Sequence, residues 1–463
     1  MILAVSLSSS NIHETIFRFG IDGLDEYYYG VLTPGTIITV AGHPGSGKTT
    51  FASQLCYSNA TEGKKCLYIS TQEPEEKFMK HMARLGFNFE VLLASDTFRF
   101  VRFPLISSEE ALDSLLESIT NLVVEFKPKI IVIDSVTPIT KAIQSDIKRR
   151  AMLQNFFYNI AFDIKGAIVL VAEIPLGKEY IEEAGDVEFV ADGIIILKHS
   201  IEYGLLSRRM EIRKLRGAPI EVSEVPFTIQ APEGIVVMMP PKSLKPKYYL
   251  KYFRTLCQEL DERIGPLRSG ELVLIAGPPH RLLLGSIIKW ALRVARESNA
   301  KLAIITYKGV EEEVKEITET FSKTLSLSSD NINVAILNAA ILSPEALLSS
   351  EINIISKIKP DIIIHYGTET LRILYAKTYP GLFEKYKLIG KSLLRKYNAL
   401  TIEIQSITDI SEVSADLNLA DTVILLGENV KGLPEGKLIA YKAIEDKRYI
   451  DSLEKIEKCI PIS

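Results

Sequence analysis

The chain has 463 residues, enough for about two or three domains of ordinary size. With 47% apolar residues, 24% charged residues and a formal net charge of −4, the composition excludes a disordered chain and disfavours a strongly cationic nucleic-acid binder. No run of apolar residues reaches the roughly eighteen that a membrane span needs, and the first residues lack the basic start of a secretory signal. A soluble, cytoplasmic protein without membrane insertion is therefore expected.

The four cysteines are scattered along the sequence, at Cys56, Cys66, Cys257 and Cys459. No C-x-x-C pair occurs, which argues against a disulfide framework and against a zinc ribbon. Buried thiols are the expectation. The six histidines show neither an H-x-x-x-H spacing nor a Cys/His cluster, so a protein-ligated transition-metal site is not expected.

In the first half, short apolar runs alternate with segments of helical period. The expected strands are residues 37–41, 66–69, 98–101, 130–133, 167–171 and 193–197. The expected helices are residues 49–59, 75–85, 108–126 and 148–162. This βαβα order predicts an α/β fold with a mostly parallel sheet flanked by helices.

The second half repeats this rhythm. Its expected strands are residues 272–276, 302–305, 334–337, 362–364, 401–404 and 423–426. TPGTIITVAGHPG at 33–45 lines up with RSGELVLIAGPPH at 268–280, and KPKIIVID at 127–134 lines up with KPDIIIHY at 359–366. A repeat of this length indicates duplication of a whole domain rather than a solenoid unit.

The boundary between the two copies is expected in a segment rich in Pro and Lys. MMPPKSLKPKYY contains few core residues and separates the last apolar run of the first copy from the first run of the second. We predict a first domain at 1–237, a linker at 238–249 and a second domain at 250–463.

A phosphate-binding loop is the strongest motif of the first half. The pattern G-x-x-x-x-G-K-S/T is met by Gly42-His43-Pro44-Gly45-Ser46-Gly47-Lys48-Thr49. The glycines let backbone N–H groups turn around a phosphate, Lys48 reaches the β- and γ-phosphates, and Thr49 offers a hydroxyl to Mg²⁺. An ordinary glycine-rich turn is the alternative, which the preceding strand and the following helix disfavour.

Two carboxylates follow neighbouring strands of this half. Asp134 ends the run KIIVID, at the edge of the sheet where doubly wound folds hold ligands, and is the second candidate holder of Mg²⁺. The alternative role for Asp134 is a helix N-cap. Glu73, in ISTQEP, could orient the attacking water or accept its proton, but it could equally be a solvated loop acid.

Cations cluster after the last strands of the first half: Arg208, Arg209, Arg213, Lys214 and Arg216. One interpretation is a basic strand face in water. The functional interpretation is an arginine finger, which stabilises charge on a transferring phosphoryl group.

These motifs together resemble a known family. GIDGLDEYYYG, LTPGTIITVAGHPGSGKTTFASQ, LYISTQEPEE, IIVIDSVTPI, LVAEIP, ADGIIILKH and RRMEIRKLRG follow one another in the order typical of the KaiC-like branch of the RecA-superfamily ATPases. The resemblance covers nearly all of residues 14–230. It implies two tandem RecA-like P-loop domains, ATP and Mg²⁺ as cofactors, and a homo-oligomer, in this family a hexameric ring with nucleotide between subunits.

The resemblance also implies roles for single residues. Those implied to hold ATP and Mg²⁺ are Gly45, Gly47, Lys48, Thr49 and Thr50, with Gly42, Pro44 and Ser46 completing the loop. Lys214 and Arg216 would reach the γ-phosphate of the neighbouring subunit, so that hydrolysis would depend on assembly. Where the family commonly has two consecutive glutamates, this chain has Gln72-Glu73; Glu73 matches the second, the usual base candidate, and the turnover rate stays open.

The second half departs from the motif. Leu283 stands at the position of Lys48, Leu284 at that of Thr49, and Tyr366 at that of Asp134. Without the cation and both Mg²⁺ holders, this copy is expected to be a RecA-like domain without ATPase activity. The finger segment reads Lys442-Ala443-Ile444-Glu445, and the pair His280-Arg281 is expected to be solvated rather than to grip an anion.

Three functions are compatible with this pattern. The leading hypothesis is a Mg²⁺-dependent ATPase active in the first domain only, with sites completed between subunits. The second is a slow or non-hydrolysing ATP-dependent scaffold that recruits an unknown protein partner. The third is a recombinase-like DNA-binding ATPase, which Lys148-Arg149-Arg150 and the linker lysines support but the acidic balance disfavours.

Overall fold

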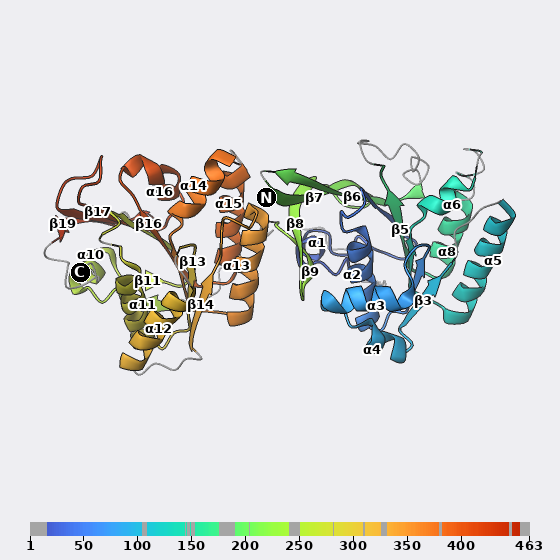
Figure 1. Ribbon diagram of the computed structural model, residues 1–463, viewed down its shortest axis with the longest axis horizontal. Coiled ribbons are helices and arrows are strands. Elements are labelled where there is room, and N and C mark those ends of the chain that lie inside the picture. The colour runs from blue at the N-terminus through green and yellow to red at the C-terminus, as the bar shows by residue number, and fades with distance from the viewer. Residues whose placement is uncertain are drawn as a thin grey trace, which may run out of the picture. The chain divides into compact units, whose positions relative to one another are not determined.

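The structure is a computed structural model (Figure 1). It describes residues 16–103, 109–143, 145, 149, 153–175, 190–202, 204–239, 251–280, 282–308, 311–325, 331–378, 382–443 and 447–453. The chain divides into two compact units, Met1–Met239 and Pro240–Ser463. The predicted linker falls largely on residues 240–250, outside the described residues, so its exact boundaries stay a prediction.

The first unit is built on one sheet with a parallel part and an antiparallel extension. The parallel strands are β1 (Ile37–Gly42), β2 (Cys66–Ser70), β3 (Phe98–Arg102), β4 (Ile130–Asp134), β5 (Ala167–Glu173) and β6 (Gly193–Glu202). The antiparallel strands are β7 (Leu205–Leu215), β8 (Glu224–Gln230) and β9 (Gly234–Val237). In the described residues the strand order is β3-β2-β4-β5-β1-β6-β7-β8-β9, which places β1 in the middle.

Helices cover both faces of this sheet (Figure 1). They are α1 (Asp22–Tyr27), α2 (Lys48–Thr61), α3 (Glu75–Arg84), α4 (Phe89–Ala94), α5 (Glu109–Phe126), α6 (Thr137–Lys141) and α8 (Tyr158–Asp163). Phe51 of α2 belongs to the core on one face, and Phe126 of α5 to the core on the other. The helix expected at 148–162 differs: Leu153–Phe157 form a π-helical turn before α8, and most of 148–152 lies outside the described residues.

The second unit repeats the sheet. Its parallel strands are β12 (Leu272–Gly277), β13 (Leu302–Thr306), β14 (Ile332–Ile336), β15 (Ile362–Tyr366), β16 (Leu400–Ser406) and β17 (Thr422–Gly427). The antiparallel strands β18 (Lys437–Lys442) and β19 (Lys447–Ser452) follow, and β10 (Tyr252–Phe253) pairs separately with β11 (Leu267–Arg268). The described order β14-β13-β15-β16-β12-β17-β18-β19 matches the first unit strand for strand except β9.

The helices of the second unit also lie on both faces of its sheet. They are α10 (Gln258–Ile264), α11 (Leu284–Ser298), α12 (Glu311–Thr324), α13 (Pro344–Ile358), α14 (Glu369–Thr378), α15 (Leu382–Lys396) and α16 (Ser414–Leu417), with a 3₁₀ turn at Ile410–Val413. The predicted fold class, two tandem α/β domains with mostly parallel sheets, is confirmed. Among the described helices, none combines the length and the apolar character that crossing a bilayer requires.

The expectation of buried thiols is wrong for the first unit. Cys56 of α2 and Cys66 of β2 form a disulfide, with Cα atoms 5.9 Å apart. The spacing of ten residues conceals this pairing, because α2 ends between the two cysteines and the chain turns back alongside it into β2. Cys257 is disulfide-bonded as well, and Cys459 lies outside the described residues.

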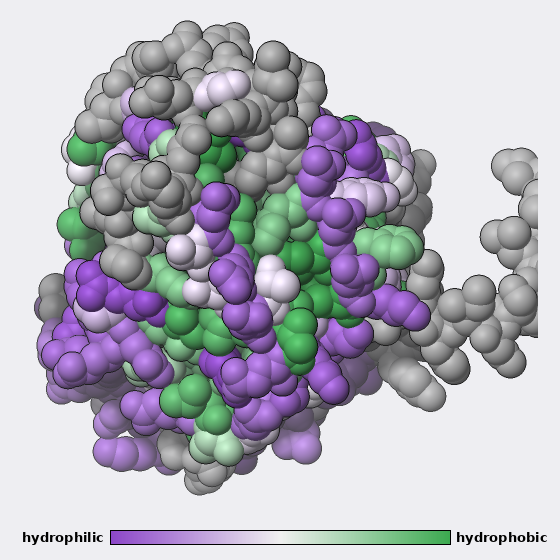
Figure 2. Space-filling model, turned by 90° about the vertical axis from the view of Figure 1, so that its right-hand side faces the viewer, coloured by the Kyte–Doolittle hydropathy of each residue, from purple (hydrophilic) through white to green (hydrophobic). Residues whose placement is uncertain are grey.

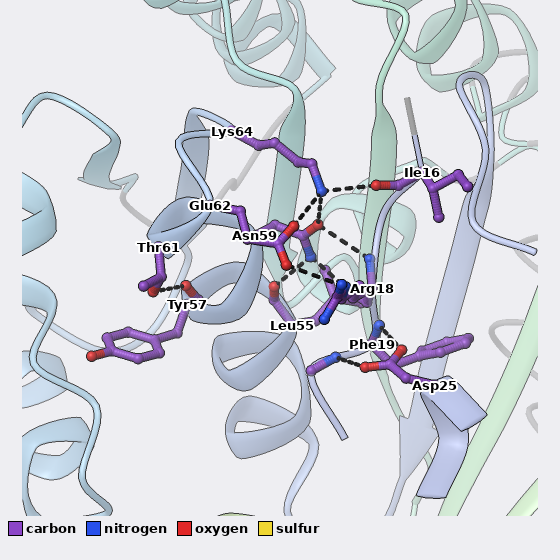
Figure 3. Close-up of polar contacts among 11 residues, drawn as sticks. Ile16, Arg18, Phe19, Asp25, Leu55, Tyr57, Asn59, Thr61, Glu62 and Lys64 are labelled. Carbon is purple, nitrogen blue, oxygen red and sulfur yellow. Dashed lines mark hydrogen bonds and ion pairs between the residues drawn. The ribbon is translucent and has the colours of Figure 1, made fainter. Parts of the chain in front are cut away.

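The helix that follows the phosphate-binding loop is anchored at its far end to the segment before α1 (Figure 3). Asn59 is fully buried; its amide N–H₂ donates to Arg18 O (2.7 Å) and Leu55 O (2.9 Å), and its Oδ1 accepts from Arg18 N (3.2 Å). The Lys64 ammonium donates to Ile16 O at 2.8 Å. These contacts tie the far end of α2 to the segment before α1.

Replacing this amide should destabilise the first unit. Asn59→Ala removes the partner of the part-buried backbone N–H and carbonyl of Arg18, so the free energy of unfolding should fall by about 1–3 kcal/mol. Thr61→Ala, whose hydroxyl bonds the backbone at an exposed site on the same helix, should change it by less than about 0.5 kcal/mol. Urea denaturation of both variants measures the difference; equal stabilities would contradict the anchoring role.

Candidate active site

The loop between β1 and α2 forms a cradle of backbone groups. Gly45 (φ 78°) and Gly47 (φ 103°) adopt the left-handed conformation that favours glycine, and α2 begins directly afterwards at Lys48. A Cβ on Gly42 would lie 2.3 Å from the Leu197 carbonyl oxygen, so β6 packs against the loop closely enough to require glycine. A loop of this shape at a helix N-terminus suits a phosphate.

The Lys48 side chain lies over this cradle. Its ammonium donates to the His43 carbonyl oxygen at 2.9 Å and is largely buried. Burial lowers the pKa of Lys48, while the charges of Glu173 and Asp134 act in the opposite direction. The loop also holds a buried hydroxyl, Ser46 Oγ, with no hydrogen-bond partner among the described residues. The loop therefore carries a positive charge beside the backbone groups that would surround a phosphate.

Thr49 and Asp134 meet at the carboxyl edge of the sheet. The Thr49 hydroxyl donates to Asp134 Oδ2 at 2.7 Å, and the Tyr68 hydroxyl donates to the same oxygen at 2.7 Å. Burial raises the pKa of Asp134, whereas these two hydrogen bonds and the Lys48 charge lower it. A hydroxyl and a carboxylate at this distance offer the hard oxygen ligands that Mg²⁺ prefers, so the residues fit the ion.

Glu73 lies on the wall of the same site. Thr49, Asp134 and Glu73 together line a cavity of about 270 Å³. The Glu73 carboxylate is 3.0 Å from His81 Nδ1 and 3.7 Å from Lys77 Nζ, and its side chain is only 23% exposed. It is therefore held by two groups of α3 rather than free in solvent.

Three residues of this site were not found by sequence analysis. Tyr68 holds the Asp134 carboxylate, His81 holds Glu73, and the Glu173 carboxylate accepts from the Gln72 side-chain amide at 2.9 Å. Glu173 could have been found, because it ends β5, the parallel neighbour of β4, and the ends of neighbouring parallel strands share one edge. Burial raises the pKa of Tyr68 well above its usual value, so its hydroxyl stays a donor.

The remaining predicted loop residues lie around the cradle. Pro44 and Gly45 are exposed at its tip, and Thr50 is half-buried in the first turn of α2. All of the predicted loop positions therefore belong to one continuous turn at the end of the central strand.

The cations of the first unit do not form one cluster. Gly193 pairs with Ile38 of β1 and with Leu215 of β7, so Lys214 and Arg216 lie beside the start of β1. Gly42 lies four residues further along that strand, about 13 Å away. The Arg216 guanidinium is 62% exposed and forms an ion pair with Asp192 at 3.0 Å.

Arg208 and Arg209 lie towards the opposite end of β7, whereas Arg213 is next to Lys214. Arg208 pairs with His199 of β6, two residues past the partner of Gly42. Burial, followed by the charges of Arg208, His43 and Lys48, lowers the pKa of His199. His199 is therefore within electrostatic reach of the loop residues His43 and Lys48. Arg209 forms an ion pair with Glu224 (3.5 Å) and Arg213 one with Glu211 (2.9 Å), which fits a basic strand face in water.

The corresponding loop of the second unit is closed by different side chains. Leu283, at the position of Lys48, is 55% exposed and immediately precedes α11, which begins at Leu284. The Tyr366 hydroxyl, at the position of Asp134, donates to the Leu282 carbonyl oxygen at 2.9 Å. His280 lies 3.5 Å from Glu428, and Arg281 is outside the described residues.

The central strand of this parallel sheet leads into a glycine-rich loop, and the following helix begins with Lys48 and Thr49. An Asp ends a nearby strand at the same edge of the sheet. These features define a P-loop nucleotide-binding unit of RecA type. The KaiC ATPase family matches residues 17–242. The first unit is thus a KaiC-like ATPase domain of the RecA superfamily, as the motifs predicted.

Individual relatives agree with this membership. The chain is 28% identical over 232 residues to the circadian clock protein KaiC3 of Synechocystis sp., and 28% identical over 222 residues to the circadian clock oscillator protein KaiC of Thermostichus vulcanus. These matches cover 47% and 45% of the chain, but only 45% and 42% of the relatives. A UPF0273 protein of Thermotoga maritima is 26% identical over 236 residues, covering 48% of the chain and 94% of that protein.

Proposed function

We propose that the first unit binds and hydrolyses ATP with Mg²⁺. The observation that carries this proposal is the convergence of Thr49, Asp134 and Glu73 on one cavity, with the Lys48 ammonium within electrostatic reach. In this site Lys48 attracts the β- and γ-phosphates, while Thr49 and Asp134 hold the ion. When bound, Mg²⁺ neutralises charge on the phosphate oxygens.

Glu73 is the base of the proposed reaction. A water attacks the γ-phosphorus, the bond to the β,γ-bridging oxygen breaks, and the Glu73 carboxylate accepts the proton of the water. His81 and Lys77 restrict the carboxylate to the cavity wall. Gln72 supplies no second carboxylate, because its side chain is an amide; that amide donates to Glu173.

We further propose that the site is completed by a second copy of the chain. Lys214 and Arg216 lie about 13 Å along β1 from the end that carries the loop, too far for either side chain to reach the phosphates of its own subunit. Arg216 is exposed beside Tyr158 and Phe162 of α8, which line the same surface hollow. Figure 2 shows that apolar side chains gather among hydrophilic ones on the end of the first unit.

Glu73→Gln tests the assigned reaction. The amide keeps the size of the side chain but cannot accept a proton, so steady-state phosphate release should fall by about 10²–10⁴-fold while ATP binding stays within about two-fold. Glu76→Gln, on the exposed side of α3, is the matched control and should hydrolyse ATP like the unchanged chain. Unchanged release in Glu73→Gln would remove Glu73 from the reaction.

The alternative is an ATP-dependent scaffold that hydrolyses slowly or not at all. The replacement of a carboxylate by Gln72 and the altered loop of the second unit favour it. Stable ATP binding with negligible phosphate release by the unchanged chain would support the scaffold over the enzyme. The DNA-binding alternative has no structural support, since Lys148, Arg150 and the linker lysines lie outside the described residues.

A further inference from the structure

The second unit buries a cluster of charged side chains on one face of its sheet. His365 Nε2 lies 2.9 Å from Glu351 Oε1, and Lys391 Nζ lies 3.2 Å from Asp416 and 3.7 Å from Glu403. Each of these five side chains is less than a tenth exposed. They come from α13, β15, α15, β16 and α16, so distant parts of the sequence converge on this place.

The first unit has an apolar core at the same positions. In the second unit, Glu403 of β16 pairs with Leu274 of β12. The equivalent of Leu274 is Thr39 of β1, which pairs with Leu170 of β5, so Leu170 stands at the position of Glu403. By the same alignment Ile133 stands at the position of His365. Both Leu170 and Ile133 are fully buried in a hydrocarbon core. The duplicated sheet therefore folds without charges here, and replacing buried ion pairs by packed apolar side chains is often neutral or stabilising.

The charged cluster borders a cavity. The cavity measures about 80 Å³, and one water needs roughly 10–15 Å³ on this scale, so it has room for about five to eight heavy atoms. Its apolar walls include Leu348, Leu371 and Phe383. One buried polar atom on its lining, Thr368 Oγ1, has no hydrogen-bond partner among the described residues.

The charged groups around the cavity are paired. Each carboxylate has a basic partner: Glu351 lies beside His365, Glu403 beside Lys391, and Asp416 beside Lys387 and Lys391. Burial lowers the pKa of His365, but the adjacent Glu351 carboxylate outweighs it, and the net shift is upward. Because these groups already pair with one another, a further charge in the cavity would have to be buried unpaired.

We propose that this cavity binds a small amphiphile of no net charge, with a branched apolar body against the leucines and Phe383 and a polar head at the Thr368 hydroxyl. The site lies on the sheet face opposite Tyr366 and the altered phosphate loop, because successive residues of a strand point to opposite faces. It does not depend on ATP hydrolysis in the first unit.

Three probes with the same isobutyl body test the proposal on the full chain. They are 3-methylbutanamide, which is neutral, 3-methylbutanoate, an anion, and 3-methylbutylamine, a cation. Ligand-observed NMR titration should show saturable binding of the amide, at least about ten-fold tighter than binding of either charged probe. Absence of amide binding, or equal binding of a charged probe, would overturn the proposal.

Variants locate the binding. Gly390 lines the cavity, and a Cβ there would lie 3.1 Å from Leu348 Cδ1, so Gly390→Leu should fill the space and weaken amide binding at least about ten-fold. Leu388→Ala, exposed on the same helix, is the control. Should Gly390→Leu not fold, Thr368→Val keeps the shape, removes the hydroxyl and should also weaken amide binding. Unchanged affinity in a folded variant of either kind would exclude this cavity as the site.

Discussion

The Lys48→Ala chain is expected to lose ATP binding. The ammonium is largely buried over the phosphate cradle, and the one hydrogen bond described for it goes to the His43 carbonyl oxygen of the loop itself. Removing the charged partner of a desolvated phosphate costs about 2–5 kcal/mol, which weakens binding roughly 30- to 4000-fold. The loop glycines stay in place, so the loss reflects charge rather than unfolding.

Titration calorimetry with ATP and Mg²⁺ measures this loss. Lys80→Ala, exposed on α3, removes an equal charge away from the site and should bind ATP like the unchanged chain. The unchanged chain should bind one ATP per chain, not two. Residual tight binding to Lys48→Ala would place a second nucleotide site in the second unit and contradict the expected asymmetry.

The asymmetry has a structural basis in the second loop. Leu283 offers no charge, Leu284 no hydroxyl, and the Tyr366 hydroxyl is already engaged with Leu282 O. A triphosphate here would lose its hydration without gaining a cation or a metal in return. The same fold thus loses the chemistry of nucleotide binding through three side chains, while the strand order of its sheet is kept.

The strands and the phosphate loop could be predicted because local sequence determines them. A buried parallel strand is a short apolar run, as in residues 130–133, and observed β4 (Ile130–Asp134) differs by one residue. The strand ends were predicted less well, even in buried strands: β15 (Ile362–Tyr366) extends two residues and β6 (Gly193–Glu202) five residues beyond the predicted ends. An apolar run marks the buried part of a strand, not the point where its backbone pairing stops. The phosphate loop requires glycine at positions with positive φ, so the motif can be recognised from the sequence alone.

The rest depends on contacts between distant segments. Neither the disulfide between Cys56 and Cys66 nor the hydrogen bond from Tyr68 to Asp134 has a fixed sequence spacing. The sequence shows His365 as one isolated histidine, because its partner Glu351 belongs to helix α13, fourteen residues before it. Charged residues that converge only in the folded core leave no periodic pattern in the sequence.

The second large effect is expected when two inactive chains are mixed. Glu73→Gln lacks the base but keeps Arg216, whereas Arg216→Ala keeps the base but lacks the finger. If the finger acts on the neighbouring subunit, an intact Glu73 can face an intact Arg216 in a mixed assembly. With equal amounts and random mixing, half of the sites have the base and half of those face the finger, so activity should recover to about a quarter of that of the unchanged chain.

The geometry makes this outcome specific. Arg216 lies beside the start of β1 and the phosphate loop follows its end, so no rearrangement of the side chain alone joins them within one subunit. Each variant measured by itself should release phosphate at least about 10²-fold more slowly than the unchanged chain. Mixing Glu73→Gln with Lys48→Ala is the control, because neither chain then carries both an intact loop and an intact base. A finger acting within its own subunit predicts no recovery in the first mixture, since no chain there contains both Glu73 and Arg216.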